Sequence, residues 1–425
     1  MANTQPPLEH PDSISSQDPN LQPEEKKKSR RPANTAFRQQ RLKAWQPILT
    51  PKTVLPLFFI IGIIFAPIGG GLLYASAVVQ EIILDYSRCH LDAPDWPIDN
   101  VEVPHYEMHF AENKSSTVKA KMPTWSRRRV PIKFGDRQME TWQCQLNFSI
   151  PNNMEPPVYF YYRLTNFYQN HRRYAKSFNT DQLSGKAVSA SAIHGSDCTP
   201  LTTTTVDNVT KPYYPCGLAA NSMFNDTFYS PTFLTPTDQN VPNTTYPMTQ
   251  KGIAWSSDRE LYGKSEYDLF KDVAVPPNWE DRYGKAYTPD NYPKLEDWEA
   301  FHVWMRLAGL PTFSKLAQKN ENMTMQIGSY SVNVDHFFNV IDYGGTKAII
   351  ISTGTVMGGK NPFLGIAYVV VGGICIVLGA LFTVTHLIKP RKLGDHTYLS
   401  WNNENTHANA TTSGRDGVFG GERGG

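Results

Sequence analysis

The chain has 425 residues, of which 40% are hydrophobic, and its formal net charge is +2. Lys and Arg (41) nearly balance Asp and Glu (39), which argues against the strongly basic surface of a nucleic-acid-binding protein. Mean hydropathy is −0.42 although the chain contains two long apolar segments, so the sequence outside them is that of a water-exposed protein.

The N-terminal region has two parts. Residues 1–35 are rich in Pro, Ser, Gln and acidic residues, which predicts a disordered tail. In the juxtamembrane residues 36–53, apolar side chains alternate with basic ones. This pattern fits either a short amphipathic segment at a membrane surface or ordinary basic residues beside an interfacial tryptophan. The side chains concerned are Phe37, Arg38, Arg41, Leu42, Lys43 and Trp45.

Two segments, 54–79 and 363–388, contain no Asp, Glu, Lys or Arg. Each exceeds the about 20 apolar residues that a helix needs to cross a bilayer. A cleavable signal peptide is not expected, because its apolar core spans only about 7–15 residues near the N-terminus. We therefore predict two transmembrane helices, with residues 80–362 on one side of the membrane and both termini on the other.

Positive charge predicts the orientation of these helices. Lys and Arg recur from Lys26 to Lys52 with no acid between them, and Lys389, Arg391 and Lys392 follow the second segment. Because Lys and Arg near membrane ends stay in the cytosol, both termini are expected there. Residues 80–362 then form a lumenal or extracellular domain, and residues 389–425 form a second cytosolic tail that is mostly disordered.

The region 80–362 has further features of a secreted domain. An even number of cysteines in an oxidising compartment suggests two disulfides, whereas Cys375, in the second apolar segment, is expected to be a small packing residue. The cysteines of the domain are Cys89, Cys144, Cys198 and Cys216. Its Asn-x-Ser/Thr sequons, which are candidate glycosylation sites, are at Asn113, Asn147, Asn208, Asn225, Asn243 and Asn322.

Residue patterns predict a β-rich α+β ectodomain with an antiparallel sheet core and long glycosylated loops. The strongest strand candidates are 141–150, 157–164, 324–334 and 346–353. Residues 170–176 and 296–307 have helical spacing of apolar side chains. The turn-rich connections are 199–215, 230–250 and 271–294.

Small residues recur in both apolar segments. They recur every four residues in the first and every seven in the second, which favours close packing of the helices against each other or a partner. The alternative is that glycine is simply common in membrane helices. The residues are Gly62, Ala66 and Gly70 in the first segment and Gly365, Gly372 and Gly379 in the second.

The sequence offers no catalytic, cofactor or metal site. Residues 354–361 resemble a phosphate-binding loop, but Asn361 replaces the Ser or Thr that holds Mg²⁺. His105 and His109 have a metal-compatible spacing, but Pro104 and polar neighbours predict a loop there. Without ionisable groups in its apolar segments, the chain is not expected to transport ions or polar substrates by itself.

Two further segments attract attention. His171, Arg172 and Arg173 could act in catalysis, but structural hydrogen bonding within the ectodomain is the preferred interpretation. The apolar run from Trp304 to Leu310 could belong to the core or to an interface, and the core is preferred.

Several sequence blocks, in this order, are similar to the cell-division-control-fifty / ligand-effect-modulator family, over residues 34–392. The segment 89–144 resembles the fungal branch. The blocks are FRQQRLKAWQP (37–47), YYRLTNFYQNHRRYAKS (161–177), PCGLAANSMFNDTF (215–228), KGIAWSSDRELYGK (251–264), VWMRLAGLPTFSKL (303–316) and YGGTKAIIISTGTVMGGKNPFLGIAYVVVGG (343–373).

The resemblance implies a non-catalytic accessory (β) subunit of a type IV P-type ATPase, a phospholipid flippase. Such a subunit forms a heterodimer with the ATPase, supports its exit from the endoplasmic reticulum and its activity, and occurs in the Golgi, endosomes or plasma membrane. The cysteines would pair in sequence order, Cys89 with Cys144 and Cys198 with Cys216. Asn225, inside the FNDT block, is the best candidate for a glycan.

The resemblance also implies partner contacts. The segment FRQQRLKAWQP would run along the cytosolic face of the ATPase, and the apolar helices would flank its last membrane helices. Two other functions remain to be distinguished: a stand-alone two-span glycoprotein receptor or adhesion protein, and a lumenal enzyme tethered to the membrane.

Overall fold

The computed structural model describes residues 35–42, 50–98, 101–110, 121–234, 244–354 and 359–390. Residues 58–381 form one compact unit, and the described residues on either side of this range belong to a second.

Two long helices, α1 (Pro51–Val78) and α10 (Phe363–Ile388), match the two apolar segments. Both are long and apolar enough to cross a membrane. Within residues 58–381 the two helices pair in an antiparallel manner, because Gly62 faces Gly372 and Gly69 faces Gly365. The glycines let the backbones approach closely, as in other membrane helix pairs.

The contact face of α1 corrects the predicted spacing. Ala66, predicted together with Gly62, packs against Gly372, but the buried residues of the helix are Gly62, Gly69 and Ser76, which recur every seven residues. Gly70 is exposed, and a side chain added there would meet no atom within 4 Å. A repeat of seven keeps one face of a helix toward a single partner helix over several turns, so α1 adopts the same repeat as α10.

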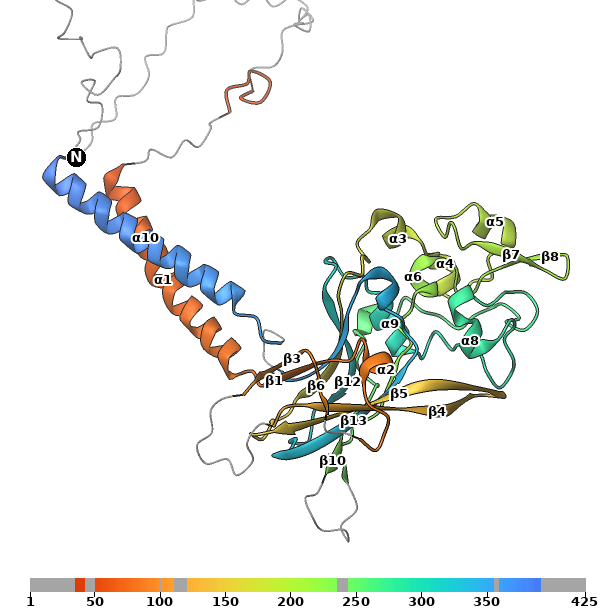
Figure 1. Cartoon of the computed structure of the whole chain (residues 1–425). Coiled ribbons are helices and arrows are strands. Elements are labelled where there is room, and N and C mark those ends of the chain that lie inside the picture. The colour runs from red at the N-terminus through yellow and green to blue at the C-terminus, as the bar shows by residue number, and fades with distance from the viewer. Residues whose placement is uncertain are drawn as a thin grey trace, which may run out of the picture. The chain divides into compact units, whose positions relative to one another are not determined.

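The ectodomain contains two antiparallel sheets (Figure 1). The first has five strands in the order β12-β6-β14-β1-β3. Its strand β6 alternates buried and half-buried residues, the pattern of a strand with one face in a core. The strands are β1 (Glu81–Asp85), β3 (Tyr106–His109), β6 (Val158–Leu164), β12 (Phe313–Asn320) and β14 (Lys347–Thr353).

The second sheet has the order β11-β10-β13-β5-β4-β2, and β9 also pairs with β13. Leu146 and Phe148 of this sheet share one hydrophobic core with Phe160 and Ile351 of the first, so the two sheets form a sandwich. The strands are β2 (Val101–Glu102), β4 (Thr124–Phe134), β5 (Arg137–Ile150), β9 (Thr227–Phe228), β10 (Thr232–Leu234), β11 (Thr244–Thr245) and β13 (Gly328–His336).

Between β6 and β12 the chain forms short helices and a hairpin, β7 (Thr203–Val206) with β8 (Val209–Pro212), joined by long connections. In Figure 1 the green helices α4, α5, α6 and α8 lie together beside the sheets. The short helices of the ectodomain, including α2 before β6 and η2 after β12, are α2 (Cys89–Asp92), α3 (Arg172–Lys176), α4 (Thr180–Leu183), α5 (Ala190–His194), α6 (Leu218–Asn221), α7 (Ser256–Arg259), η1 (Pro277–Trp279), α8 (Glu280–Tyr283), α9 (Glu299–Met305) and η2 (Ile341–Tyr343).

Besides β10 and β11 in the predicted connection 230–250, two further predicted loops contain strands. Residues 203–212, inside a predicted turn-rich connection, form the β7–β8 hairpin. His109, predicted to lie in a loop, ends β3, which pairs with β1. In both places polar residues occupy strands whose exposed faces tolerate them, so the apolar content is too low to reveal the strand.

Two disulfides join segments that are distant along the chain. Cys89 on α2 is bonded to Cys144 on β5, and Cys198 is bonded to Cys216 across the β7–β8 hairpin. These are the pairings that the resemblance implies. The chain-entropy model gives each a stabilisation of about 3–5 kcal/mol, because each bond restricts the unfolded chain.

Candidate functional site

A buried ion pair lies next to one of the sequons. Lys347 Nζ is 2.6 Å from Asp226 Oδ2, and both side chains are 0% exposed. Asp226 also accepts hydrogen bonds from the Tyr86 hydroxyl and from the backbone N–H groups of Phe337 and Phe338. Burial alone raises the pKa of the Asp226 carboxyl, but Lys347 and these N–H donors hold it below its usual range.

The ion pair connects three segments of the ectodomain. Lys347 begins β14, Tyr86 follows β1, and Asp226 precedes β9. The ammonium also donates to the Phe338 carbonyl oxygen at 2.6 Å. Because each buried polar atom has a partner here, the network stabilises the position of Asp226, and with it the sequon residue Asn225.

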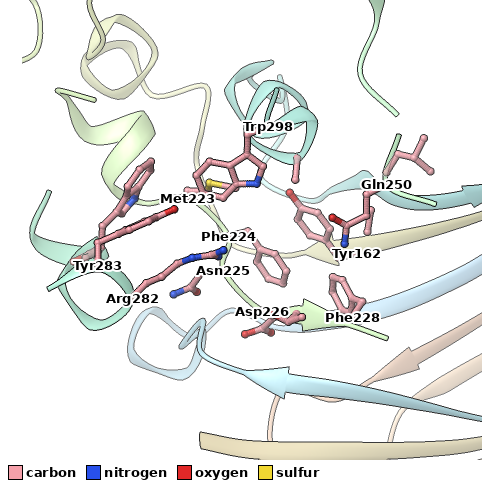
Figure 2. A pocket seen from close by; sticks show the side chains of 16 residues that line it. Tyr162, Met223, Phe224, Asn225, Asp226, Phe228, Gln250, Arg282, Tyr283 and Trp298 are labelled. Atoms are coloured by element: carbon pink, nitrogen blue, oxygen red, sulfur yellow. The ribbon is translucent and has the colours of Figure 1, made fainter. Parts of the chain in front are cut away.

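A pocket with a volume of about 190 Å³ opens beside this sequon (Figure 2). Its walls come from β6, α8, α9, β12 and the segment between α6 and β9. Trp298 and Tyr283 supply aromatic surface, and Arg282 and Asn225 supply polar groups. Figure 2 shows these labelled side chains directed into the same space.

Arg282 is an unusual lining residue. Its guanidinium lies 5.5 Å from the ring centre of Trp298 and 4.8 Å from that of Phe134, so aromatic faces stabilise its charge. Within the described part of the chain, it forms no ion pair, and its buried Nε has no hydrogen-bond partner.

The sequons occupy different environments. Asn208, in the β7–β8 turn, and Asn322, after β12, are exposed. Asn147 lies on β5, between β4 and β13, inside the predicted strand 141–150, and is half-buried. Asn225 is half-buried at the pocket. Asn113 and Asn243 lie outside the described residues.

The predicted partner-binding residues are divided between the two units. Residues 35–42 form hydrogen-bonded turns in which Phe37 is 76% exposed; Arg38 and Arg41 are exposed too. Trp45 lies outside the described residues. Gly62, Gly365 and Gly372, which were predicted to pack against the other helix or a partner, are buried in the contact between α1 and α10, because only a residue without a side chain fits there.

Comparison with known proteins identifies the family. The model of the LEM3 (ligand-effect modulator 3) family / CDC50 family matches residues 72–392. This chain belongs to the LEM3/CDC50 family.

Several named relatives match almost end to end. The chain is 41% identical to "Phospholipid-transporting ATPase accessory subunit CRF1" of Saccharomyces cerevisiae, over 89% of this chain and 91% of the relative. It is 42% identical to "Phospholipid-transporting ATPase accessory subunit CDC50" of Chaetomium thermophilum, over 88% and 91%. "Cell cycle control protein 50A" of Mus musculus is 38% identical, over 84% and 89%.

In this LEM3/CDC50 protein, the described residues of the segment that resembles a phosphate-binding loop make hydrogen bonds within the chain. The N–H of Gly354, which would have faced a phosphate, donates to the Pro157 carbonyl oxygen. The Asn361 side chain accepts a hydrogen bond from the N–H of Phe363 at the start of α10. Residues 355–358 lie outside the described chain. Among the described residues, no group of His, Cys, Asp and Glu is arranged to hold a metal ion.

The basic cluster of residues 171–173 differs from its prediction. His171, Arg172 and Arg173 are exposed and form no side-chain hydrogen bond or ion pair with the described residues. The expected hydrogen bonding within the ectodomain is therefore wrong. The apolar run 304–310, predicted to belong to the core, does so only in part. Trp304 is buried in the core, whereas Leu310 is 69% exposed.

The pocket and the ion pair had no signal in the sequence. Asp226 and Lys347 are 121 residues apart, and only the sheet topology brings them together. Arg282 and Trp298 lie in a region predicted to be a turn-rich connection and a helix, respectively. A cation close in sequence to aromatic residues is too common to identify a pocket.

Proposed function

We propose that this chain is the non-catalytic accessory subunit of a phospholipid-transporting type IV P-type ATPase. The observation that carries the proposal is the similarity, at 41–42% identity over about nine tenths of the chain, to relatives named as accessory subunits of such ATPases. The subunit binds the catalytic subunit as a heterodimer and supports its folding, its exit from the endoplasmic reticulum and its lipid-moving activity.

In this proposal the chain is an integral membrane protein of the secretory and endosomal system. Residues 1–35 and 389–425 are cytosolic tails, 54–79 and 363–388 cross the membrane, and 80–362 face the lumen or the outside. The cytosolic charge clusters support this orientation. The two disulfides and the exposed sequons at Asn208 and Asn322 fit an oxidising, glycosylating compartment.

The partner contacts follow from what the chain leaves uncovered. The contact between α1 and α10 already buries Gly62, Gly365 and Gly372, so the ATPase would meet the outer, apolar sides of the helices, where Gly70 lies. The cytosolic segment 36–53 would extend along the ATPase, with exposed Phe37 and the neighbouring arginines as contacts.

The deciding experiment is affinity purification of the tagged chain from its native membranes in mild detergent, followed by mass spectrometry. A type IV P-type ATPase in near-equimolar amount is expected. Recovery of the chain alone, as a folded glycoprotein that has left the endoplasmic reticulum, would contradict the proposal and favour the stand-alone receptor or adhesion protein.

A further inference from the structure

The contact face shared by α1 and α10 changes its residues toward the start of α1 and the end of α10. The seven-residue repeat that places small residues in this face continues to Leu55 in α1 and to His386 in α10. Both positions carry a large side chain, where the repeat elsewhere has glycines such as Gly62 and Gly379. Membrane helices approach closely where the facing residues are small. Leu55 and His386 therefore hold the two helix ends apart.

A pocket with a volume of about 690 Å³ lies between these helix ends. Its lining combines apolar side chains with hydroxyl and nitrogen groups. The volume lies within the range of about 300–1,000 Å³ that is usual for small-molecule sites. The lining residues that matter most here are Val54, Leu55, Phe382, Thr385, His386 and Lys389. Such a pocket suits a ligand that has both a polar head and an apolar stem.

The charge around the pocket is positive. Residues 26–57 and 382–394 contain Lys and Arg but no Asp or Glu. These segments therefore offer no carboxylate to pair with the ammonium group of Lys389. His386, half-buried in the pocket, adds an imidazole that can donate a hydrogen bond. The complementary ligand is an anion from outside the chain.

The position of the pocket indicates the source of this anion. Val54 and Phe382 belong to the ends of the two apolar helices, and Lys389 is the first charged residue after α10. Such a change from apolar to basic residues marks the head-group level on the cytosolic side of a membrane. Anionic phospholipids lie in this leaflet, and basic pockets between membrane helices on the same side bind their head groups.

We propose that the pocket between the start of α1 and the end of α10 binds an anionic phospholipid of the cytosolic leaflet. Lys389 and His386 hold the head group, and Val54, Leu55 and Phe382 contact an acyl chain. The lipid fills the space that the helices leave open and joins their cytosolic ends. The inference rests on the membrane orientation in the proposed function, but not on the presence of an ATPase.

The test maps the attachment of a photoreactive lipid to the full chain, purified in mild detergent with any subunit that accompanies it. The probe is a phosphatidylserine with a photoreactive acyl chain, and peptide mass spectrometry locates the cross-links. We expect cross-links within residues 50–55 and 382–389. Unlabelled phosphatidylserine should compete at least about tenfold better than phosphatidylcholine with the same acyl chains, because only phosphatidylserine has a net negative charge.

Two pairs of variants separate the pocket from a general attraction of lipid to basic residues. Lys389→Gln should reduce cross-linking about fivefold, the usual effect of one lysine near an anionic membrane surface. Lys52→Gln, at an exposed lysine of α1 outside the pocket, should reduce it by less than about twofold. Val54→Phe fills the pocket and should also reduce cross-linking. Val384→Phe, at an exposed position of α10 outside the pocket, should not.

Each contrary result would overturn a stated part of the inference. Equal losses in Lys389→Gln and Lys52→Gln would overturn the pocket as the binding site. Equal competition by phosphatidylcholine would overturn the selection of an anionic head group. Competition by inorganic phosphate as effective as that by phosphatidylserine would overturn lipid as the ligand and leave a site for free phosphate.

These outcomes are distinct from failure of the proposed function, because the cross-links are located on this chain whether or not an ATPase accompanies it. A chain that binds the lipid as expected but purifies alone would contradict the accessory-subunit role and leave the lipid site intact. A chain that purifies with an ATPase but shows no selective cross-link would do the reverse.

Discussion

The helix pair and the ectodomain are stabilised in opposite ways. Between α1 and α10, glycines leave no room for a side chain, and the association depends on the close fit of two backbones, because lipid is as apolar as the helices themselves. The ectodomain instead depends on large buried aromatic side chains, two disulfides and a buried ion pair. The helix pair is therefore sensitive to added volume, and the ectodomain to the loss of a group.

The largest effect is expected from the buried ion pair. Asp226→Asn leaves the Lys347 ammonium buried without a counter-charge, which costs about 3–5 kcal/mol of the free energy of unfolding. The substitution keeps the Asn-x-Thr sequon at Asn225, so a loss of stability would not come from a lost glycosylation site. Denaturant unfolding of the full chain in detergent measures the loss.

Two comparisons sharpen this prediction. Adding Lys347→Met to Asp226→Asn removes both charges and should recover much of the stability. Asp95→Asn, at an ion pair in which the Asp95 side chain is 75% exposed, should change stability little. An Asp226→Asn chain as stable as the Asp95→Asn chain would show that the ectodomain does not depend on its buried charges.

Loss of a disulfide should have the next largest effect. Cys198→Ser opens the bond to Cys216, which closes a loop with a sequence separation of 18, at a cost of about 3 kcal/mol. We expect the chain and its ATPase to be retained in the endoplasmic reticulum, as measured by cell fractionation and glycan maturation. Cys375→Ser, at the free cysteine of α10, is the control and should traffic normally. Normal delivery of both Cys198→Ser and Cys216→Ser would count against this mechanism.

The sequence predicted the parts of the fold in which apolar residues recur regularly. Both long helices and the central strands β5, β6 and β14 were confirmed, because their apolar side chains recur at regular spacing; in β5 the predicted residues 141–150 are the ones that reach the core. The long strand β4 was missed. It contains consecutive arginines and Pro131, and the exposure of many of its residues lets polar side chains occupy a strand.

Long-range contacts set a second limit on prediction. The pairing of Asp226 with Lys347 and the gathering of Arg282 and Trp298 around Asn225 depend on sheet topology, to which local patterns are blind. In α1, adjacent glycines at 69–71 left the contact face ambiguous by one residue, and the spacing of four selected Gly70 instead of Gly69.

Adjacent glycines also provide a matched test of the helix pair, because in α10 one of them, Gly372, faces α1 and its neighbour Gly373 does not. A side-chain carbon added at Gly372 would lie 2.9 Å from the backbone N of Ala66, whereas one added at Gly373 would meet no atom within 4 Å. Gly372→Val should therefore weaken helix pairing by about 1–3 kcal/mol, the usual cost of overpacking, and Gly373→Val should not. Cysteine cross-linking between α1 and α10 measures the pairing.

The same contrast can be made in α1, with Gly69→Val against Gly70→Val. A carbon at Gly69 would lie 2.7 Å from the backbone N of Val369, and one at Gly70 is unopposed. If the variants at position 70 lost ATPase binding while helix pairing stayed intact, Gly70 would face the partner, as proposed. Equal pairing in all four variants would contradict the glycine contact.

The smallest effect concerns pH and distinguishes the ectodomain from the helix pair. His336 on β13 packs against His90 with the rings tilted by 45° and their centres 3.9 Å apart, near Lys347 and Asp226. Burial, with Lys347 adding to it, lowers the pKa of His336 to about 3, and burial lowers the pKa of His90 as well. Between about pH 3 and 6.5 the unfolded chain therefore binds a proton at His336 that the folded chain does not.

Stability accordingly falls as the pH falls through this window. From pH 7.5 to 5.5, His336 alone should remove about 1.4 kcal/mol, since each pH unit below the unfolded pKa costs about 1.36 kcal/mol. His336→Gln should reduce the slope of stability against pH in denaturant unfolding, whereas His194→Gln, at an exposed position on α5, should not. An unchanged slope in His336→Gln would mean that His336 binds its proton in the folded ectodomain too, and that acid acts on stability elsewhere.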